Sequence, residues 1–164
     1  VALSMASQYP ARVLKLVLCN PFSFLRAGAL FPFQTNAQLW RNGLSQGALF
    51  QIIMPWLFSD SLLANRALVD DMVSFAASQK AVQALYAFEN QIAALVHCDV
   101  RSTLSKVHQS VLLLAGTKDL LVPAGYVRAL AERLSDARLV SIISAHMMIV
   151  EQPEQIIGQV KAFI

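Results

Sequence analysis

The sequences VLLLAGTKDLLVP (residues 111–123) and ARLVSIISAHMMIVEQPE (residues 137–154) decide the fold of this 164-residue chain. Each opens with a run of Val, Leu and Ile that has the length and composition of a strand buried on both faces. Each run is followed within a few residues by a polar candidate residue, Asp119 after the first and His146 after the second. Residues 123–134 predict a helix between them, and Pro153 is typical of the first turn of a final helix over residues 151–164. This order indicates parallel strands joined by right-handed crossovers.

Asp119 and His146 are the candidate catalytic residues. In an open parallel sheet, functional side chains gather beyond the carboxyl ends of the strands, which is where both residues stand. In a hydrolytic triad, the carboxylate fixes the tautomer of the imidazole, and the imidazole takes the proton of a nucleophile. The alternatives are that Asp119 only forms a turn and that His146 is structural. The two strand ends, taken together, favour the catalytic pair, whereas His97 and His108 stand where capping or surface roles are expected.

The chain divides into three predicted parts. Residues 1–21 predict a helix that stops at Tyr9-Pro10 and then a buried strand over residues 12–19, closed by Asn20-Pro21. Residues 22–98 predict consecutive helices without a strand, which form a helical cap inserted over the sheet. Residues 99–164 predict the C-terminal part of the core, which carries the acid and the histidine. The fold class is therefore α/β, with three strands of a doubly wound parallel sheet and a helical insertion.

Residues 22–98 carry the local signals that divide this segment into helices. We expect breaks at Pro32, Gly43 and Pro55 and helix starts at Ser59-Asp60 and Asn65. Most of the aromatic residues of the chain fall here, and ligand pockets are largely apolar and aromatic. We therefore expect a hydrophobic acyl or aryl pocket under the cap. After the cap, Asp99 is a natural N-cap for a short helix over residues 99–107.

The polar motifs resemble those of the α/β-hydrolase fold, in its capped esterase and 3-oxoadipate enol-lactonase-like branch. Residues 116–123 (GTKDLLVP) look like the acid turn G-x-x-D-x-x-x-P of that family, and residues 145–154 (AHMMIVEQPE) look like its histidine loop G-H-x-x-x-x-E-x-P-E. Ala145 stands where the family usually has Gly. The resemblance implies a serine-type hydrolase of small apolar carboxylic esters, lactones or thioesters. It implies neither a metal nor an organic cofactor.

The resemblance also implies that the nucleophile lies outside this sequence. Residues 1–21 look like the helix and strand that follow the nucleophile elbow, so the family motif G-x-S-x-G-G would lie just before Val1. The chain would then resemble the C-terminal portion of an enzyme, inactive by itself and stable only against the missing N-terminal half of the fold or a partner chain. Without that half or partner, the first predicted strand, residues 12–19, would be an exposed edge of the sheet.

A letter match to the nucleophile motif occurs within the chain but lacks the required context. Residues 43–47 (GLSQG) fit G-x-S-x-G, yet the polar residues 36–42 (NAQLWRN) precede them instead of a buried strand. The strained strand-to-helix turn is what exposes the nucleophile, so we do not expect Ser45 to be it. Ser4 stands on a predicted helix and has no elbow either.

Two other kinds of function remain open in the sequence. One is a non-catalytic, truncated or pseudo-hydrolase chain that binds an apolar ligand or a partner chain. The other is a helical interaction module, which fits residues 22–96 but leaves Asp119 and His146 unexplained. Nucleic-acid binding is not expected, because the net charge of +3 is scattered rather than clustered. No apolar run reaches the length of a membrane span.

The cysteines and the first residues predict the compartment. Cys19 and Cys98 show neither metal-ligand spacing nor a redox pair, which is typical of free thiols in a reducing environment. The first residues lack the basic flank and apolar core of a secretory signal. We therefore expect a cytoplasmic protein whose partners are a small apolar ester-type substrate and the remainder of the fold.

Overall fold

The core is a three-stranded parallel sheet in the order β1-β2-β3, seen in a computed structural model that describes residues 1–79 and 83–164. The strands are β1 (Lys15–Cys19), β2 (Ser110–Gly116) and β3 (Ala137–Ile142). Strand β2 pairs with both neighbours, with Leu16 opposite Val111 and Leu113 opposite Leu139. The predicted parallel sheet is confirmed.

Helices cover both faces of the sheet, which explains why β2 is apolar from Val111 to Ala115. Successive side chains of a strand point to opposite faces. Val111 and Leu113 pack on the side of α1 (Ala2–Gln8), η2 (Arg101–Lys106) and α7 (Ala124–Ala131). Leu112 and Leu114 pack on the side of α8 (Met148–Glu151) and α9 (Pro153–Lys161). Both sets are completely buried.

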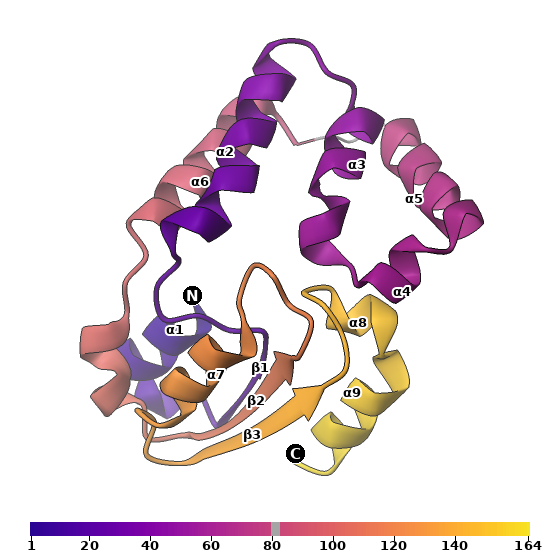
Figure 1. Cartoon of the computed structure of the whole chain (residues 1–164). Helices are drawn as coiled ribbons and strands as arrows, with labels where there is room; N and C mark the ends of the chain where they lie inside the picture. The colour runs from indigo at the N-terminus through magenta and orange to yellow at the C-terminus, as the bar shows by residue number, and fades with distance from the viewer. Residues whose placement is uncertain (80–82) are drawn as a thin grey trace.

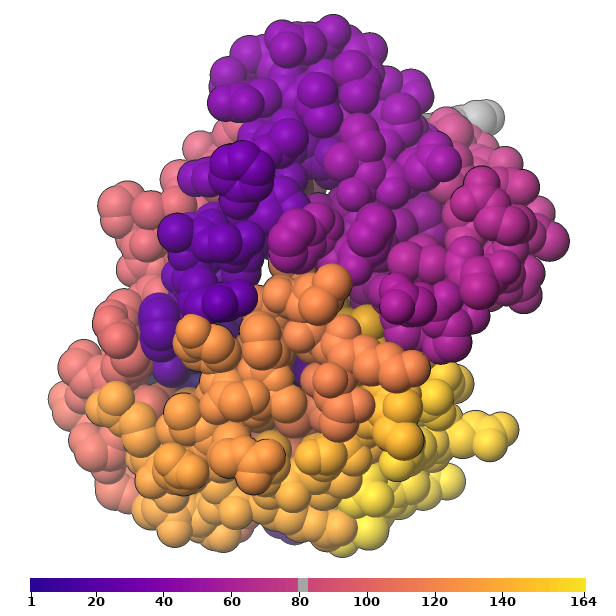
Figure 2. Space-filling view, in the orientation of Figure 1, coloured from indigo at the N-terminus to yellow at the C-terminus, as the bar shows by residue number. Residues whose placement is uncertain are grey.

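A helical insertion separates β1 from β2 in the chain. It comprises α2 (Ala27–Arg41), α3 (Gln46–Leu57), α4 (Asp60–Leu63), α5 (Arg66–Ser78) and α6 (Leu85–Val96). Figure 1 shows it on the side of the sheet to which the strands point, with α2 beside α6 and α3 beside α5. Figure 2 shows the same helices resting on the C-terminal third of the chain. The insertion therefore covers the edge of the sheet at which Asp119 and His146 stand.

Several predicted boundaries of the insertion are confirmed, and two are wrong. Gly43 ends a helix in a left-handed conformation (φ 89°), and Asn65 caps α5 by accepting a hydrogen bond from Leu68 N–H. Pro32 and Pro55, however, lie inside α2 and α3 instead of ending them. Each proline removes one backbone donor, and packing of the surrounding helix compensates for that local loss.

The segments around the core strands also differ in detail from the prediction. The first strand begins at Lys15, because η1 (Pro10–Arg12) takes up the start of the predicted segment. Asp99 does not cap an α-helix: its Oδ1 accepts from Arg101 N–H at the start of the 3-10 helix η2. The final helix is divided at Gln152 into α8 and α9, with Pro153 in the first turn of α9. Within the described residues, no helix is both long enough and apolar enough to cross a membrane.

Candidate active site

The Asp119 carboxylate is fixed by the turn that follows β2. Its Oδ1 accepts hydrogen bonds from the N–H groups of Leu121 (2.8 Å) and Val122 (2.9 Å), and its side chain has no exposed surface. The other oxygen, Oδ2, lies 2.8 Å from Nδ1 of His146. Backbone donors thus hold one carboxylate oxygen so that the other faces the imidazole.

His146 follows β3 and completes the pair that was predicted from the sequence. Because a carboxylate carries no donor, Nδ1–H of His146 is the donor to Asp119, and in the neutral imidazole this bond selects the tautomer in which Nε2 is the acceptor. The His146 side chain is 28% exposed, whereas that of Asp119 has no exposed surface. The free Nε2 can therefore accept a proton from a reacting group, which is the geometry of the base and its orienting acid.

Asn20, at the end of β1, clamps the histidine loop to the sheet. Its Nδ2 donates to the backbone carbonyls of Ala145 (3.1 Å) and His146 (2.9 Å), and its Oδ1 accepts from Gly116 N–H (2.6 Å). Asn20 is buried and has a φ of 46°, a left-handed conformation that Asn tolerates better than most residues. Sequence reasoning took Asn20-Pro21 only as the end of a strand and missed this role.

Gly116 leaves room for the histidine loop to approach the end of β2. A Cβ at this position would lie 2.7 Å from the Ser144 carbonyl oxygen and 2.8 Å from that of Ala145. Since both are backbone atoms, they cannot be relieved by a change of rotamer. The glycine of the motif GTKD is thus required by close packing of the two loops that carry the acid and the histidine.

Glu151 joins the histidine loop to the helical insertion. Its Oε2 accepts from Ala145 N–H (3.1 Å), and its Oε1 accepts from Ser59 N–H (2.6 Å), between α3 and α4. A further backbone bond runs from Met147 N–H to the Leu57 carbonyl oxygen (2.9 Å). The motif pattern in the sequence included Glu151 but gave it no role.

The other sequence candidates lie apart from the pair. Ser45 is the N-cap of α3, where its Oγ accepts from Ala48 N–H, and it follows helix α2 and Gly43 rather than a strand. Ser4 is within α1, as predicted. His97 ends α6 and His108 precedes β2, and both are exposed. None of these four shares a recorded hydrogen bond with Asp119 or His146.

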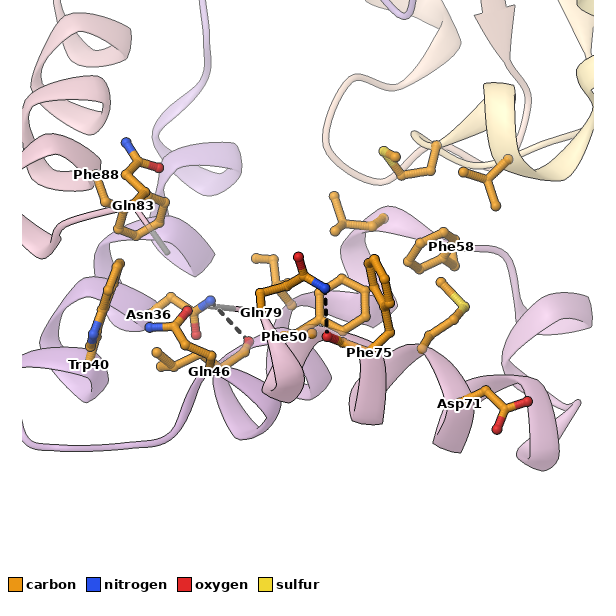
Figure 3. A pocket seen from close by; sticks show the side chains of 17 residues that line it. Asn36, Trp40, Gln46, Phe50, Phe58, Asp71, Phe75, Gln79, Gln83 and Phe88 are labelled. Carbon is orange, nitrogen blue, oxygen red and sulfur yellow. Dashed lines mark hydrogen bonds between the residues drawn. The ribbon is translucent and has the colours of Figure 1, made fainter. Parts of the chain in front are cut away.

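A cavity of about 790 Å³ opens within the insertion and reaches the histidine loop at Met147 and Val150. Aromatic rings from four helices and from the junction after α3 line it: Trp40, Phe50, Phe75 and Phe88 on the helices, and Phe58 at the junction. Figure 3 shows Trp40 and Phe88 at one end of the cavity and Phe58 toward the other. Asp119 and His146 do not line it, so the cavity reaches the histidine loop without including the pair.

Three ionisable groups outside the pair have shifted pKa values: Cys19, Asp99 and Arg101. Burial raises the pKa of the Cys19 thiol, and both Cys19 and Cys98 are free. Arg101 hydrogen-bonds the exposed Asp99 and lowers its pKa to about 2. No group of three or more His, Cys, Asp or Glu side chains arranged to hold a metal ion occurs among the described residues.

The structure of the chain is similar to solved structures of known proteins. Over 99% of its length the chain superimposes on an α/β-hydrolase enzyme, MGS-M2, from a Medee basin deep-sea metagenome library, with a TM-score of 0.85 and 22% identity. The chain has the α/β-hydrolase fold. The enol-lactonase of Burkholderia xenovorans LB400 is similar over 98% of the chain, with a TM-score of 0.81 and 19% identity. The chain corresponds to the C-terminal part of this fold, as predicted.

A sequence relative agrees with the structural neighbours. The candidate carbamate hydrolase RutD of Yersinia enterocolitica is 27% identical over the whole of the chain. No family model matches the sequence. The chain spans 59% of the RutD sequence and 60% of each of the two structures.

Proposed function

We propose that this chain is part of a serine-type α/β-hydrolase that acts on small apolar carboxylic esters, lactones or thioesters. The observation that carries the proposal is the hydrogen bond between buried Asp119 and half-buried His146 at the ends of neighbouring parallel strands. The similar enol-lactonase and carbamate hydrolase support it, because lactones and carbamates both react at an acyl carbon.

In this mechanism, His146 moves the proton and Asp119 orients His146. A serine hydroxyl attacks the acyl carbon while Nε2 of His146 accepts its proton. The imidazolium that forms is stabilised by the Asp119 carboxylate against Nδ1–H, and it then returns the proton to the leaving alcohol or thiol. Water repeats the sequence on the acyl-enzyme. The hydrogen bonds from Leu121 and Val122 keep the carboxylate in place throughout.

The helical insertion, residues 22–98 of the chain, serves as the cap that shapes the substrate site. Its cavity is lined mainly by aromatic and aliphatic side chains and adjoins the histidine loop through Met147 and Val150. Such a lining favours an apolar acyl or alcohol group. Residues 1–21 and 99–164 supply the sheet and the two polar residues.

We place the nucleophile upstream of this sequence, with the rest of the sheet beside β1. Strand β1 is at the edge of the three-stranded sheet. A groove at the start of this strand is lined by apolar residues and by the charged Arg12 and Lys15; the apolar residues include Met5, Val13, Leu14 and Ile164. Leu14 is 90% exposed in this groove. An open strand edge next to apolar surface favours pairing with another strand.

Labelling with a fluorophosphonate probe, followed by peptide mass spectrometry, tests this function. The expected adduct is on a serine outside the printed sequence, and its formation should require His146. An adduct on Ser45 would overturn the assignment of the nucleophile. Failure of any serine to react in a folded protein, together with no hydrolysis of short-chain esters, would overturn the proposed function.

The exposed edge of β1 also favours a second candidate, a non-catalytic chain that binds a partner along this edge. Asp119 and His146 would then stabilise the loops rather than act on a substrate. Fluorophosphonate labelling of the H146Q variant distinguishes the two functions. Only the hydrolase should be labelled in its native form and lose the labelling when His146 is replaced by Gln.

A further inference from the structure

Both chain neighbours of His146 are held by the helical insertion. On one side, Ala145 N–H donates to Glu151 Oε2, and Glu151 Oε1 accepts from Ser59 N–H of the insertion. On the other side, Met147 N–H donates directly to the Leu57 carbonyl oxygen at the end of α3. The backbone that carries the imidazole is therefore attached to the insertion before and after His146.

We propose that Glu151 is a positioning residue that couples the helical insertion to His146. The Glu151 carboxylate accepts one hydrogen bond from the insertion (Ser59 N–H) and one from the histidine loop (Ala145 N–H). It therefore holds the insertion and the loop at a fixed separation. Ala145 and Ser59 are both buried, and Ser59 and His146 come from segments far apart in the sequence. A movement of the α3–α4 junction is thereby transmitted to the backbone next to the imidazole.

The requirement is for a carboxylate rather than for any polar side chain. Both partners are backbone donors, and only an ionised Asp or Glu presents two acceptor oxygens. A glutamine of the same length would present one oxygen and one NH₂ group, so an amide donor would face either Ala145 N–H or Ser59 N–H. Charge-assisted bonds of this type are also stronger than neutral ones. Replacing Glu151 by Gln should therefore release one of the two attachments.

The cavity gives this coupling a role in the proposed hydrolase. Ile53 and Leu57 of α3 line the cavity together with Met147 and Val150 of the histidine loop. A substrate group that moves α3 would therefore also move the loop that holds His146. This consequence for turnover depends on the proposed function, whereas the positioning of the imidazole does not.

The first experiment is ¹⁵N and ¹H NMR of the histidine rings in the native protein that carries this chain. In the unmodified protein, His146 should show a single Nδ1–H tautomer with a downfield, slowly exchanging Nδ1 proton. E151Q should lose that proton signal and populate both tautomers. E154Q is the matched control, since Glu154 is exposed and its side chain forms no hydrogen bond with the residues that the structure describes, and it should leave the His146 signals unchanged.

Ser59→Pro provides an independent test that leaves Glu151 in place. The backbone at Ser59 (φ −75°) is compatible with proline, and Phe58 before it is extended (φ −121°, ψ 152°). S59P therefore removes the N–H donor to Glu151 without demanding a new backbone conformation. S59A is measured beside it, because it removes only the contact between the Ser59 and Ser61 hydroxyls. S59P should disturb the His146 signals more than S59A does.

In the hydrolase, a displaced imidazole should lower kcat by up to about 10²-fold with little change in KM. If E151Q and S59P are folded and keep the Nδ1–H signal, Glu151 is only a stabilising residue and the inference is wrong. If the signal is lost in both variants but no hydrolysis is found in the native protein, the inference stands and the proposed function fails. If hydrolysis is found and the signal persists in both variants, the proposed function stands and the inference about Glu151 is wrong.

Discussion

Replacing Asn20 by Ala should destabilise the protein by at least about 4 kcal/mol, a large effect for one side chain. The side chain satisfies three buried backbone groups at once, the N–H of Gly116 and the carbonyls of Ala145 and His146. Each group left unpaired costs about 1–3 kcal/mol. The Ala145 carbonyl also accepts a hydrogen bond from Ser144 Oγ at 3.3 Å. Removing the Asn20 bond to this carbonyl should therefore cost about 1 kcal/mol, the low end of that range. Alanine at a φ of 46° adds about 1 kcal/mol of backbone strain.

The free energy of unfolding is measured by urea denaturation of the native protein, with the slope of the transition checked for constancy. N20G is the matched variant, because glycine loses the same hydrogen bonds but adopts the left-handed conformation without strain. N20G should therefore be more stable than N20A by about 1 kcal/mol. A loss below about 1 kcal/mol in N20A would show that water replaces the side chain, and the clamp would carry little of the stability of the site.

Three further results are expected from residues in and around the site. Gly116→Ala should destabilise by about 1–3 kcal/mol in thermal or chemical denaturation, since its Cβ would lie 2.7 Å from a backbone oxygen. In the hydrolase, Asp119→Asn should lower kcat by about 10⁴-fold, and a loss below tenfold would remove Asp119 from the proposed triad. Alkylation of Cys19 should be slow near neutral pH and should still accelerate above the ordinary thiol pKa of about 8.5, because burial raises the pKa of this thiol. A rate for Cys19 that levels off below that pH would contradict the expected shift.

The sequence was sufficient to predict features that depend on local order along the chain. The apolar run of β2 and the polar residue after it predicted a buried strand and the location of Asp119. The run of β3 predicted a strand and the location of His146, but the predicted burial on both faces is wrong, because β3 is an edge strand in which only Ile142 is buried. Capping residues such as Asn65 marked helix starts, because an N-cap acts within its own first turn. Pro32 and Pro55 misled the prediction, since packing outweighed their local preference.

Contacts across the fold could not be predicted in this way. Asn20 and Glu151 act on groups more than 90 positions away, namely Gly116 and Ser59. Neither residue type is unusual where it stands, because Asn commonly ends a strand and Glu commonly occupies a helix. Their roles depend on which backbone groups the assembled sheet and insertion bring within hydrogen-bond distance. The cavity has the same origin, since rings from separate helices converge on it only after folding.

The two attachments of the histidine loop differ in what they depend on. Asn20 precedes the insertion and Gly116 follows it, so their hydrogen bond joins the strand that enters the insertion to the strand that leaves it. This clamp holds the loop to the sheet through groups that do not belong to the insertion. Glu151 and Leu57, in contrast, hold the loop to the insertion itself. A displacement of α3 should therefore turn the loop about the Asn20 clamp, so that His146 moves relative to Asp119 while the ends of β1 and β2 remain in place.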